Sequence, residues 1–139
     1  MTTAPNPAPD PVTVVERYLA AVAGNDMATM AQLIDQDVTW HQPGANRFSG
    51  VHHGQGAVFG LIGAMVEATA GTFRLEVTGP SLANGDLVAV PVRFTGSQGA
   101  AVMDLTGLDL HRVTDGRITE VWLFGTDQPA EDAFWDSAP

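Results

Sequence analysis

Residues 101–124, AVMDLTGLDLHRVTDGRITEVWLF, contain the pattern that decides the fold of this 139-residue chain. Asp115-Gly116 is a residue pair favoured in the tight turns of β-hairpins, and it separates two segments that read as strands. We therefore expect a long strand over Ala101–Val113 and another over Ile118–Phe124. Strands joined by so short a turn pair in the antiparallel sense.

More strands are expected upstream of this hairpin. Residues 73–78 alternate between apolar and polar side chains and stop at Gly79-Pro80. A further strand is expected over residues 87–94, after the turn signal Asn84-Gly85. The second half of the chain therefore predicts a mainly antiparallel sheet.

Helical spacing fills most of the first half of the chain. One apolar stripe begins after Pro11, a second follows the capping residue Asp26, and a third runs over residues 55–69. The apolar positions of the first two stripes are Val14, Val15, Tyr18, Leu19 and Val22, then Met27, Met30, Leu33 and Ile34. Residues 130–135 also read as a short helix. Helices followed by hairpin-linked strands indicate an α+β fold.

The chain length suits one domain. Residues 1–11 carry four prolines and no apolar periodicity, so we expect a flexible N-terminal tail followed by a single domain over residues 12–139.

The composition excludes several classes of function. Six arginines against sixteen acidic residues give a formal charge of −10, which would repel a nucleic-acid backbone. The absence of cysteine and lysine excludes disulfides, thiolate chemistry, Schiff bases and the Walker-type phosphate loop. No signal-peptide pattern and no apolar run of about 20 residues occurs. We therefore expect a cytoplasmic protein that binds neither nucleic acid nor membrane.

Asp109 stands between two leucines in the long predicted strand. Strand parity places it on one face with Leu105, Gly107 and His111. A carboxyl group there faces either solvent or a pocket, and burial in a pocket would favour its neutral form. His111 is spaced to act beside Asp109 as a base near neutral pH, or else it is a structural histidine.

Other residues complete the expected pocket. Tyr18, the only tyrosine, is either a core aromatic or a hydroxyl donor to a substrate oxygen. Residues 38–42 read as a short strand in which Trp40 and Gln42 share one face and His41 points to the other. We expect the pocket lining to include also Leu105, Gly107, Leu123, Val58 and Ile62.

The loop over residues 48–54 contains His52-His53 and follows Arg47. A metal site in this loop would need a third ligand that the sequence does not provide. We therefore expect neither a metal nor an organic cofactor.

Several short motifs follow one another in a characteristic order between residues 12 and 135. They are Glu16-Arg17-Tyr18-Leu19, the segment from Val38 to Gly44, Thr78-Gly79-Pro80, Asp115-Gly116-Arg117-Ile118, Val121-Trp122, and the ending from Asp127-Gln128 to Phe134-Trp135. Together they resemble the ketosteroid isomerase and SnoaL-like polyketide cyclase group of the nuclear-transport-factor-2-like superfamily. The resemblance implies a cone-shaped barrel: a strongly curved, mainly antiparallel sheet covered by three N-terminal helices, with a pocket between them.

The resemblance also implies roles for particular residues. In the isomerases, a tyrosine of the first helix and a protonated aspartic acid of the long strand form an oxyanion hole, which implies Tyr18 and Asp109 here. The isomerase general base would stand at Gln42, and the cyclase acid would stand at Leu123. The chain therefore departs from the family at both positions.

We accordingly expect a small-molecule isomerase or cyclase that acts on an apolar polyketide- or steroid-like substrate by acid/base catalysis. The alternative is a non-catalytic ligand-binding or assembly module of the same fold, which the missing carboxylates favour. Epoxide hydrolysis is a third hypothesis, for which Asp109 and Arg47 supply only part of the required Asp–Arg–Asp arrangement. Trp122 and Phe124 alternate with Leu123 and need a cover, so we expect a homodimer.

Overall fold

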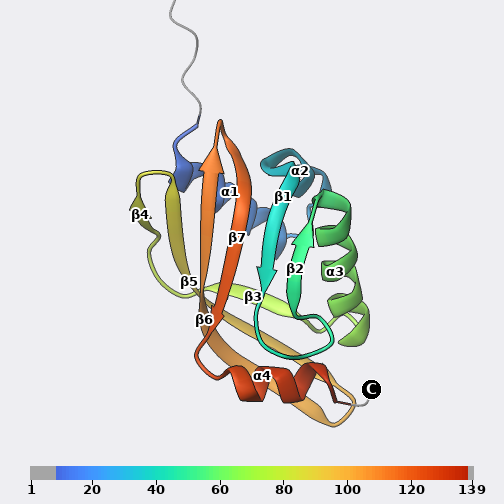
Figure 1. Ribbon diagram of the computed structural model, residues 1–139. Helices are drawn as coiled ribbons and strands as arrows, with labels where there is room; N and C mark the ends of the chain where they lie inside the picture. The colour runs from blue at the N-terminus through green and yellow to red at the C-terminus, as the bar shows by residue number, and fades with distance from the viewer. Residues whose placement is uncertain (1–8, 138–139) are drawn as a thin grey trace, which may run out of the picture.

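The computed structural model describes residues 9–137, in which four helices pack against a curled sheet (Figure 1). The elements are α1 (Pro11–Ala23), α2 (Met27–Leu33), β1 (Ile34–Gln42), β2 (Gly50–His53), α3 (Gln55–Ala68), β3 (Arg74–Val77), β4 (Leu82–Asn84), β5 (Leu87–Gln98), β6 (Ala101–Thr114), β7 (Arg117–Gly125) and α4 (Gln128–Trp135). Residues 1–8 of the expected tail and the last two residues of the expected domain lie outside this range.

The β6–β7 hairpin forms where the sequence predicts it. Asp115 and Gly116 both have positive φ, 52° and 79°, as the two central residues of a type I′ turn require. Thr114 and Arg117 pair across this turn. The twist of such a turn matches that of the two strands, so the hairpin continues into the sheet without splaying.

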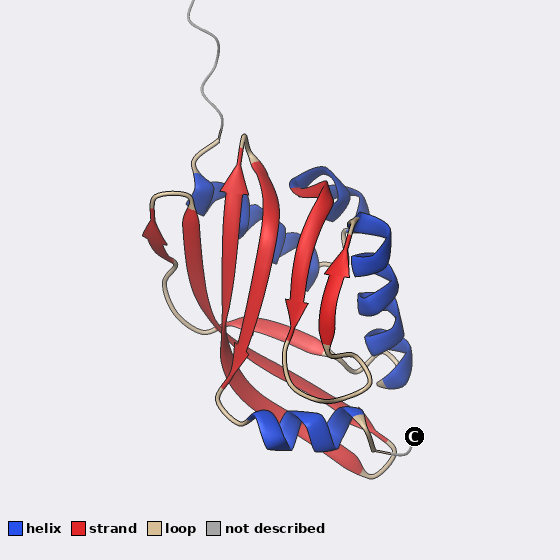
Figure 2. Ribbon diagram, in the orientation of Figure 1, coloured by secondary structure: helices blue, strands red, loops and turns tan. Residues whose placement is uncertain are grey.

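The sheet has the strand order β2-β1-β7-β6-β5-β3, with β4 also paired to β5. All these pairs are antiparallel except β1–β7, which is parallel. The long β5–β6 hairpin bends under the other strands, so the sheet curls without closing (Figure 2). The expected α+β class with a strongly curved, mainly antiparallel sheet is confirmed.

The helices begin and end at residues suited to those places. The Asp10 side chain accepts a hydrogen bond from the Thr13 amide, and Pro11 occupies the first turn of α1. Asn25, with φ of 53°, lies in the left-handed region just beyond the helix end. The buried face of α1 then packs against the sheet, with Val14 and Val15 fully inaccessible to solvent.

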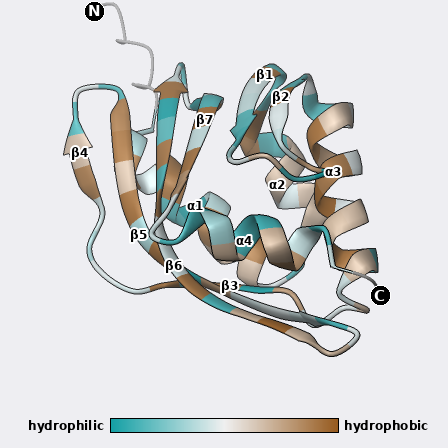
Figure 3. Cartoon of the chain, turned by 60° about the horizontal axis from the view of Figure 1, so that its bottom comes forward, coloured by the Kyte–Doolittle hydropathy of each residue, from teal (hydrophilic) through white to brown (hydrophobic). Residues whose placement is uncertain are grey.

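The three expected N-terminal helices are present, and α4 adds a fourth, close to the helix expected at residues 130–135. As Figure 3 shows, α1, α2 and α3 lie on one side of the curled sheet, and α4 lies across its open end. No helix within residues 9–137 is long and apolar enough to span a membrane.

Three details correct the expectations. Ile34 begins β1 instead of ending the second helix, because it pairs with Ile118 of β7 and is 1% exposed. Residues 50–53 form β2 rather than a loop, because they pair with β1. Residues 82–84 form β4 through their pairing with β5. For Ile34 and for residues 50–53, pairing with a segment outside the local pattern determines the conformation. Residues 82–84 instead pair with the strand that follows the Asn84-Gly85 turn signal, so only their short length kept them from being predicted.

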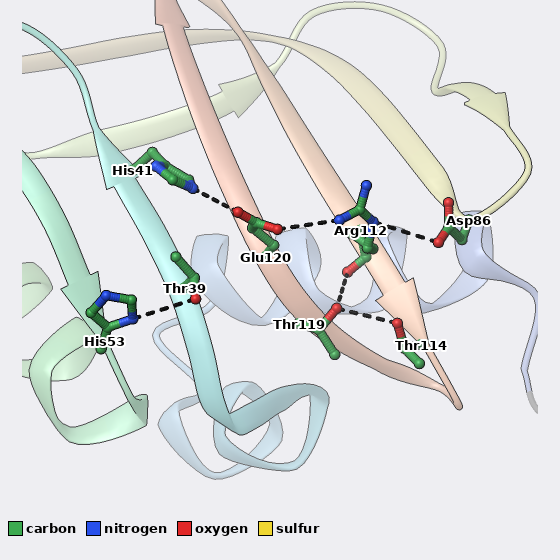
Figure 4. Close-up of polar contacts among 8 residues, drawn as sticks. All are labelled: Thr39, His41, His53, Asp86, Arg112, Thr114, Thr119 and Glu120. Atoms are coloured by element: carbon green, nitrogen blue, oxygen red, sulfur yellow. Dashed lines mark hydrogen bonds and ion pairs between the residues drawn. The ribbon is translucent and has the colours of Figure 1, made fainter.

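Among residues 9–137, the helices lie behind β1, β7 and β6 in the close-up of Figure 4, so the near face of these strands is their outer face. On this face His41 stacks on Trp122, with 5.4 Å between ring centroids and 4° between planes. Glu120 accepts from His41 at 2.7 Å and from Arg112 at 3.3 Å. His41 therefore points outward, as strand parity predicts. A largely apolar row crosses the sheet beside these charges, through Ala89, Leu110, Trp122, His41 and Val51.

We propose that a second copy of the chain covers this outer face. Leu110→Glu should then convert a dimer into a monomer, because it buries a charge in the centre of the apolar row. Val66→Glu, at an exposed position of α3 on the opposite side of the sheet, is the matched control and should leave the mass unchanged. Light scattering during gel filtration measures the mass. A wild-type monomer at micromolar concentrations would contradict the proposal.

Gly107 is required by close packing within the β6–β7 hairpin. A Cβ atom at this position would overlap with the backbone carbonyl of Phe124. Gly107→Ala should therefore lower the free energy of unfolding by about 1–3 kcal/mol. Gly63→Ala is the control, because an added methyl group on this exposed part of α3 meets nothing within 4 Å. It should be neutral or stabilising by up to about 1 kcal/mol in urea unfolding. Equal effects of the two changes would refute this view of Gly107.

Candidate functional site

A cavity of about 100 Å³ lies within the curl of the sheet, between α1, α3 and α4. That space is enough for a small organic molecule or several waters. Most of its wall is apolar. The apolar lining consists of Val22, Trp40, Pro43, Ile62, Met65, Phe73, Leu75, Phe94, Leu123, Phe124 and Trp135.

Four polar side chains interrupt this apolar wall. Tyr18 comes from α1, Gln42 from β1, Asp109 from β6 and Glu131 from α4. Elements far apart in the sequence thus converge on one cavity. Two carboxyl groups within one apolar cavity are unusual, because burial of a charge without a partner is costly.

The low polarity of the cavity changes how Asp109 titrates. Burial, assisted by the nearby charge of Glu131, raises the pKa of Asp109 to about 7. Burial also raises the pKa of Tyr18, with the charge of Asp109 as a second cause. Near neutral pH a large share of Asp109 is therefore a neutral acid beside a neutral phenol, and both can donate hydrogen bonds.

Gln42 is held in a fixed orientation. The indole nitrogen of Trp40 donates to its side-chain oxygen at 3.0 Å, and both side chains are buried. This bond occupies the carbonyl end of the amide, so the amino end remains to donate toward the cavity. The shared face of Trp40 and Gln42 is as expected from strand parity.

Glu131 was not among the residues that the sequence singled out. It is 5% exposed and receives a hydrogen bond from Gln128 at 2.8 Å. A signal was present, since Glu131 stands three and four residues before Phe134 and Trp135 and so shares their helical face. A carboxylate on the apolar stripe of a helix is uncommon and indicates a site.

Hydrogen bonds from two directions fix α4 over the cavity. The buried side chain of Gln98, at the tip of the β5–β6 hairpin, donates to the carbonyl oxygens of Phe134 at 3.1 Å and Ser137 at 2.9 Å. The carboxylate of Asp132 accepts from the Ala45 amide at 3.1 Å and the Asn46 side chain at 2.8 Å. The loop after β1 and the tip of the β5–β6 hairpin therefore both bind α4 and fix its position over the cavity.

Four of the expected site residues lie outside the cavity lining. Val58 is fully buried in the core, and Leu105 packs against that core. Gly107 packs closely against the backbone of Phe124 and leaves no room there for a Cβ atom. His111 lies on the face of Asp109, as strand parity predicts, but beneath Tyr18, whose ring it meets edge-on with centroids 5.9 Å apart. The expected residues on the lining are Tyr18, Trp40, Gln42, Ile62, Asp109 and Leu123.

His111 is poorly placed to act as a base. It is 1% exposed, its Nδ1 donates to the Val88 carbonyl at 3.2 Å, and burial lowers its pKa to about 4. A neutral ring away from the lining supports Tyr18 by packing. The structural interpretation of this histidine therefore fits best.

The loop histidines do not gather around a metal position. The ring nitrogen of His52 binds the Phe48 carbonyl, and His53 faces Thr39. Within residues 9–137 no group of three His, Cys, Asp or Glu side chains is arranged to hold a metal ion. The Arg47 side chain donates to Gln98 and is not part of the cavity lining.

Comparison with known proteins identifies the fold and family around this cavity. The model of the SnoaL-like domain matches residues 15–121. The uncharacterized protein Rv0034 of Mycobacterium tuberculosis is 32% identical over 123 residues, covering 88% of this chain and 93% of its own length. The chain belongs to the SnoaL-like domain family.

Solved structures agree with this assignment. A Xanthomonas campestris protein of unknown function with a cystatin-like fold has a TM-score of 0.88 and 39% identity, covering 93% of this chain and 100% of its own. IdmH of Streptomyces antibioticus, proposed to be a polyketide cyclase, has a TM-score of 0.70 and 22% identity, over 85% of this chain and 93% of its own. That second likeness shows the fold alone.

The resemblance implies a general base at Gln42 or at Leu123. In this SnoaL-like domain the ionisable groups of the cavity stand elsewhere. Gln42 and Leu123 both line the cavity, and neither can accept a proton at neutral pH. The carboxyl groups are instead Asp109 on β6 and Glu131 on α4. The position of the second depends on the C-terminal helix.

The titration of Asp109 can be tested through stability. Between about pH 4 and pH 7, folded Asp109 keeps a proton that the unfolded chain has released, so the free energy of unfolding falls as the pH rises. The fall should be on the order of 4 kcal/mol. Asp109→Asn has no proton to lose, so it should match the wild type near pH 4 and exceed its stability at pH 8. Urea unfolding across this range measures both proteins, and parallel curves would contradict the raised pKa.

Proposed function

We propose that this SnoaL-like domain is an isomerase or cyclase that acts on a small, largely apolar molecule by acid/base catalysis. The observation that carries the proposal is the placement of Asp109 and Tyr18 together on the wall of an apolar cavity. Neutral donors in a cavity of low polarity are suited to stabilising negative charge as it develops on a substrate oxygen.

The proposed chemistry follows from this arrangement. A substrate carbonyl placed against Asp109 and Tyr18 would accept two hydrogen bonds. These bonds strengthen as the oxygen becomes an enolate or alkoxide, so they lower the barrier rather than only improving binding. An enolate is an intermediate in both double-bond migration and ring closure, so the same donors serve an isomerase or a cyclase.

The second candidate function is binding without catalysis. It is favoured by the absence of a carboxylate at Gln42 and Leu123, where the resemblance implies one. In that case Asp109 and Tyr18 would only orient a ligand oxygen. Epoxide hydrolysis is not proposed, because Arg47 is engaged by Gln98 and lies outside the cavity lining.

Exchange of the acidic C–H hydrogens of 2-tetralone for deuterium, followed by NMR in D2O, tests catalysis with a small apolar ketone. Wild type should accelerate the exchange above the buffer rate. Asp109→Leu should slow it by about a hundredfold or more, because one donor is lost. Asp109→Asn, which keeps a weaker donor, should fall between the two, and Tyr18→Phe should also slow it.

The rate should fall as the pH rises through about 7, because Asp109 then loses the proton that it donates. Circular dichroism checks that each variant is folded. Binding of 2-tetralone without any acceleration by wild type would support the binding module and contradict the enzyme.

A further inference from the structure

We propose that Glu131 is the general base of this site and that Gln128 positions it; this inference rests on the proposed function. Both residues belong to α4, the helix that covers the cavity. Neither stands at a position where the resemblance implies a base. The assignment comes from the cavity wall and the hydrogen bonds of this chain.

The carboxylate of Glu131 is held by one oxygen. Gln128 Nε2 donates to its Oε2 at 2.8 Å and to Asp132 Oδ1 at 2.9 Å, so the amide links two neighbouring carboxylates. Within the described residues, Oε1 of Glu131 has no hydrogen-bond partner, and the residue lines the same cavity as Asp109. A carboxylate that is fixed through one oxygen, with its other oxygen free at the wall of a substrate cavity, has the geometry of a proton acceptor.

The two cavity carboxyls divide the acid and base roles between them. Like charges in one apolar site do not ionise together, so one group keeps its proton while the other loses it. Burial raises the pKa of Glu131, but the bond from Gln128 opposes that rise. Asp109 has no such donor among the described hydrogen bonds, and the Glu131 charge helps to raise its pKa to about 7. Glu131 is therefore the ionised member of the pair.

Other titratable groups near the pair do not change this division. Tyr18 on α1 stays protonated, since its pKa is raised, and buried His111 on β6 stays neutral, since its pKa is lowered to about 4. Asp132, next to Glu131 on α4, has a lowered pKa because Gln128, Asn46 and the Ala45 amide donate hydrogen bonds to it. Its negative charge adds to the rise in the pKa of Glu131, but less than burial does and less than the Gln128 bond opposes it.

The proton transfer balances with these groups alone. Glu131 Oε1 takes a proton from the carbon beside a substrate carbonyl, and the C–H electron pair forms the C=C bond of an enolate. The carbonyl π pair moves to oxygen, which accepts from Asp109 and Tyr18. In the isomerisation of a β,γ-unsaturated carbonyl compound, the enolate is conjugated with that C=C bond. Glu131 then returns the proton to the γ-carbon, the C=C bond moves next to the carbonyl carbon, and the electron pair on oxygen re-forms the C=O bond. In a ring closure, the enolate carbon attacks a second carbonyl, whose oxygen receives that proton.

The residues that line the cavity also indicate the charge of the substrate. The lining residues include no arginine, and the chain contains no lysine. A carboxylate or phosphate on the substrate would therefore meet two acidic groups and no cation, which is unfavourable in a cavity of low polarity. The expected substrate is an uncharged carbonyl compound with an acidic C–H bond, and 2-tetralone is a probe of that class.

Glu131→Gln tests the assignment in the deuterium-exchange assay. The variant keeps shape and hydrogen bonding but cannot accept a proton, so exchange should slow by about 10²–10⁴-fold while 2-tetralone still binds. Glu67→Gln, an exposed carboxylate on α3, is the matched control and should exchange at the wild-type rate. Partial rescue of Glu131→Ala by added formate would show that a carboxylate is what the reaction lacks.

The outcomes separate the two proposals. If wild type exchanges and Glu131→Gln is equally fast, Glu131 is not the base, although the proposed function stands. If wild type does not accelerate exchange, the proposed function fails together with this inference. NMR titration adds a result independent of turnover: the pKa of Asp109 should fall in Glu131→Gln, since a negative neighbour is removed. An unchanged Asp109 pKa would overturn the pairing.

Gln128→Ala tests the positioning role through the pH–rate profile. Loss of the donated hydrogen bond raises the pKa of Glu131, so the acidic limb of the profile should shift to higher pH. A lower rate with an unshifted profile would mean that Gln128 supports only the structure of α4.

Discussion

The cavity depends on the attachment of α4 to the far end of the β5–β6 hairpin. Gln98 makes that attachment: its buried amide donates to two carbonyl oxygens at the C-terminal end of α4 and accepts from Arg47 at 2.8 Å. A buried amide whose oxygen and nitrogen are both hydrogen-bonded stabilises the fold, whereas an unpaired buried amide costs free energy, so α4 has one favoured position. In that position Glu131 and Trp135 lie on the cavity wall.

The same apolar wall that would bind a ligand also sets the chemistry of the site. Withdrawal of Asp109 from water favours its neutral form, and it does so most strongly next to another carboxylate. A hydrogen bond from Gln128 compensates part of this penalty for Glu131. In the proposed acid–base pair, two groups of nearly equal intrinsic acidity differ because Glu131 has a hydrogen-bond donor within its own helix, whereas Asp109 lies between two leucines on a strand and has no such donor among the described hydrogen bonds.

The outer and inner faces of the sheet differ in whether their acidic side chains have basic partners. On the outer face, the Glu120 carboxylate accepts hydrogen bonds from His41 and Arg112 in a partly exposed network. On the inner face the carboxyl groups meet no cation among the lining residues. Strand alternation therefore places Asp109 on the cavity side and Glu120 and Arg112 on the outer face, and α4 adds Glu131 to the cavity.

Local pattern in the sequence determined the helices, the Asp115-Gly116 hairpin, and the shared face of Trp40 and Gln42, since each follows from the periodicity of nearby residues. The pattern also placed Asp109 on one face with His111, but only the tertiary structure decided that this face meets a cavity and not solvent. The tertiary structure alone decided that Ile34 enters a strand, that residues 50–53 pair with β1, and that Glu131 reaches the cavity of Asp109 from 22 positions along the chain. Those outcomes depend on pairing and packing between distant segments. A carboxyl group becomes buried, and its pKa therefore shifts, only once those segments pack together.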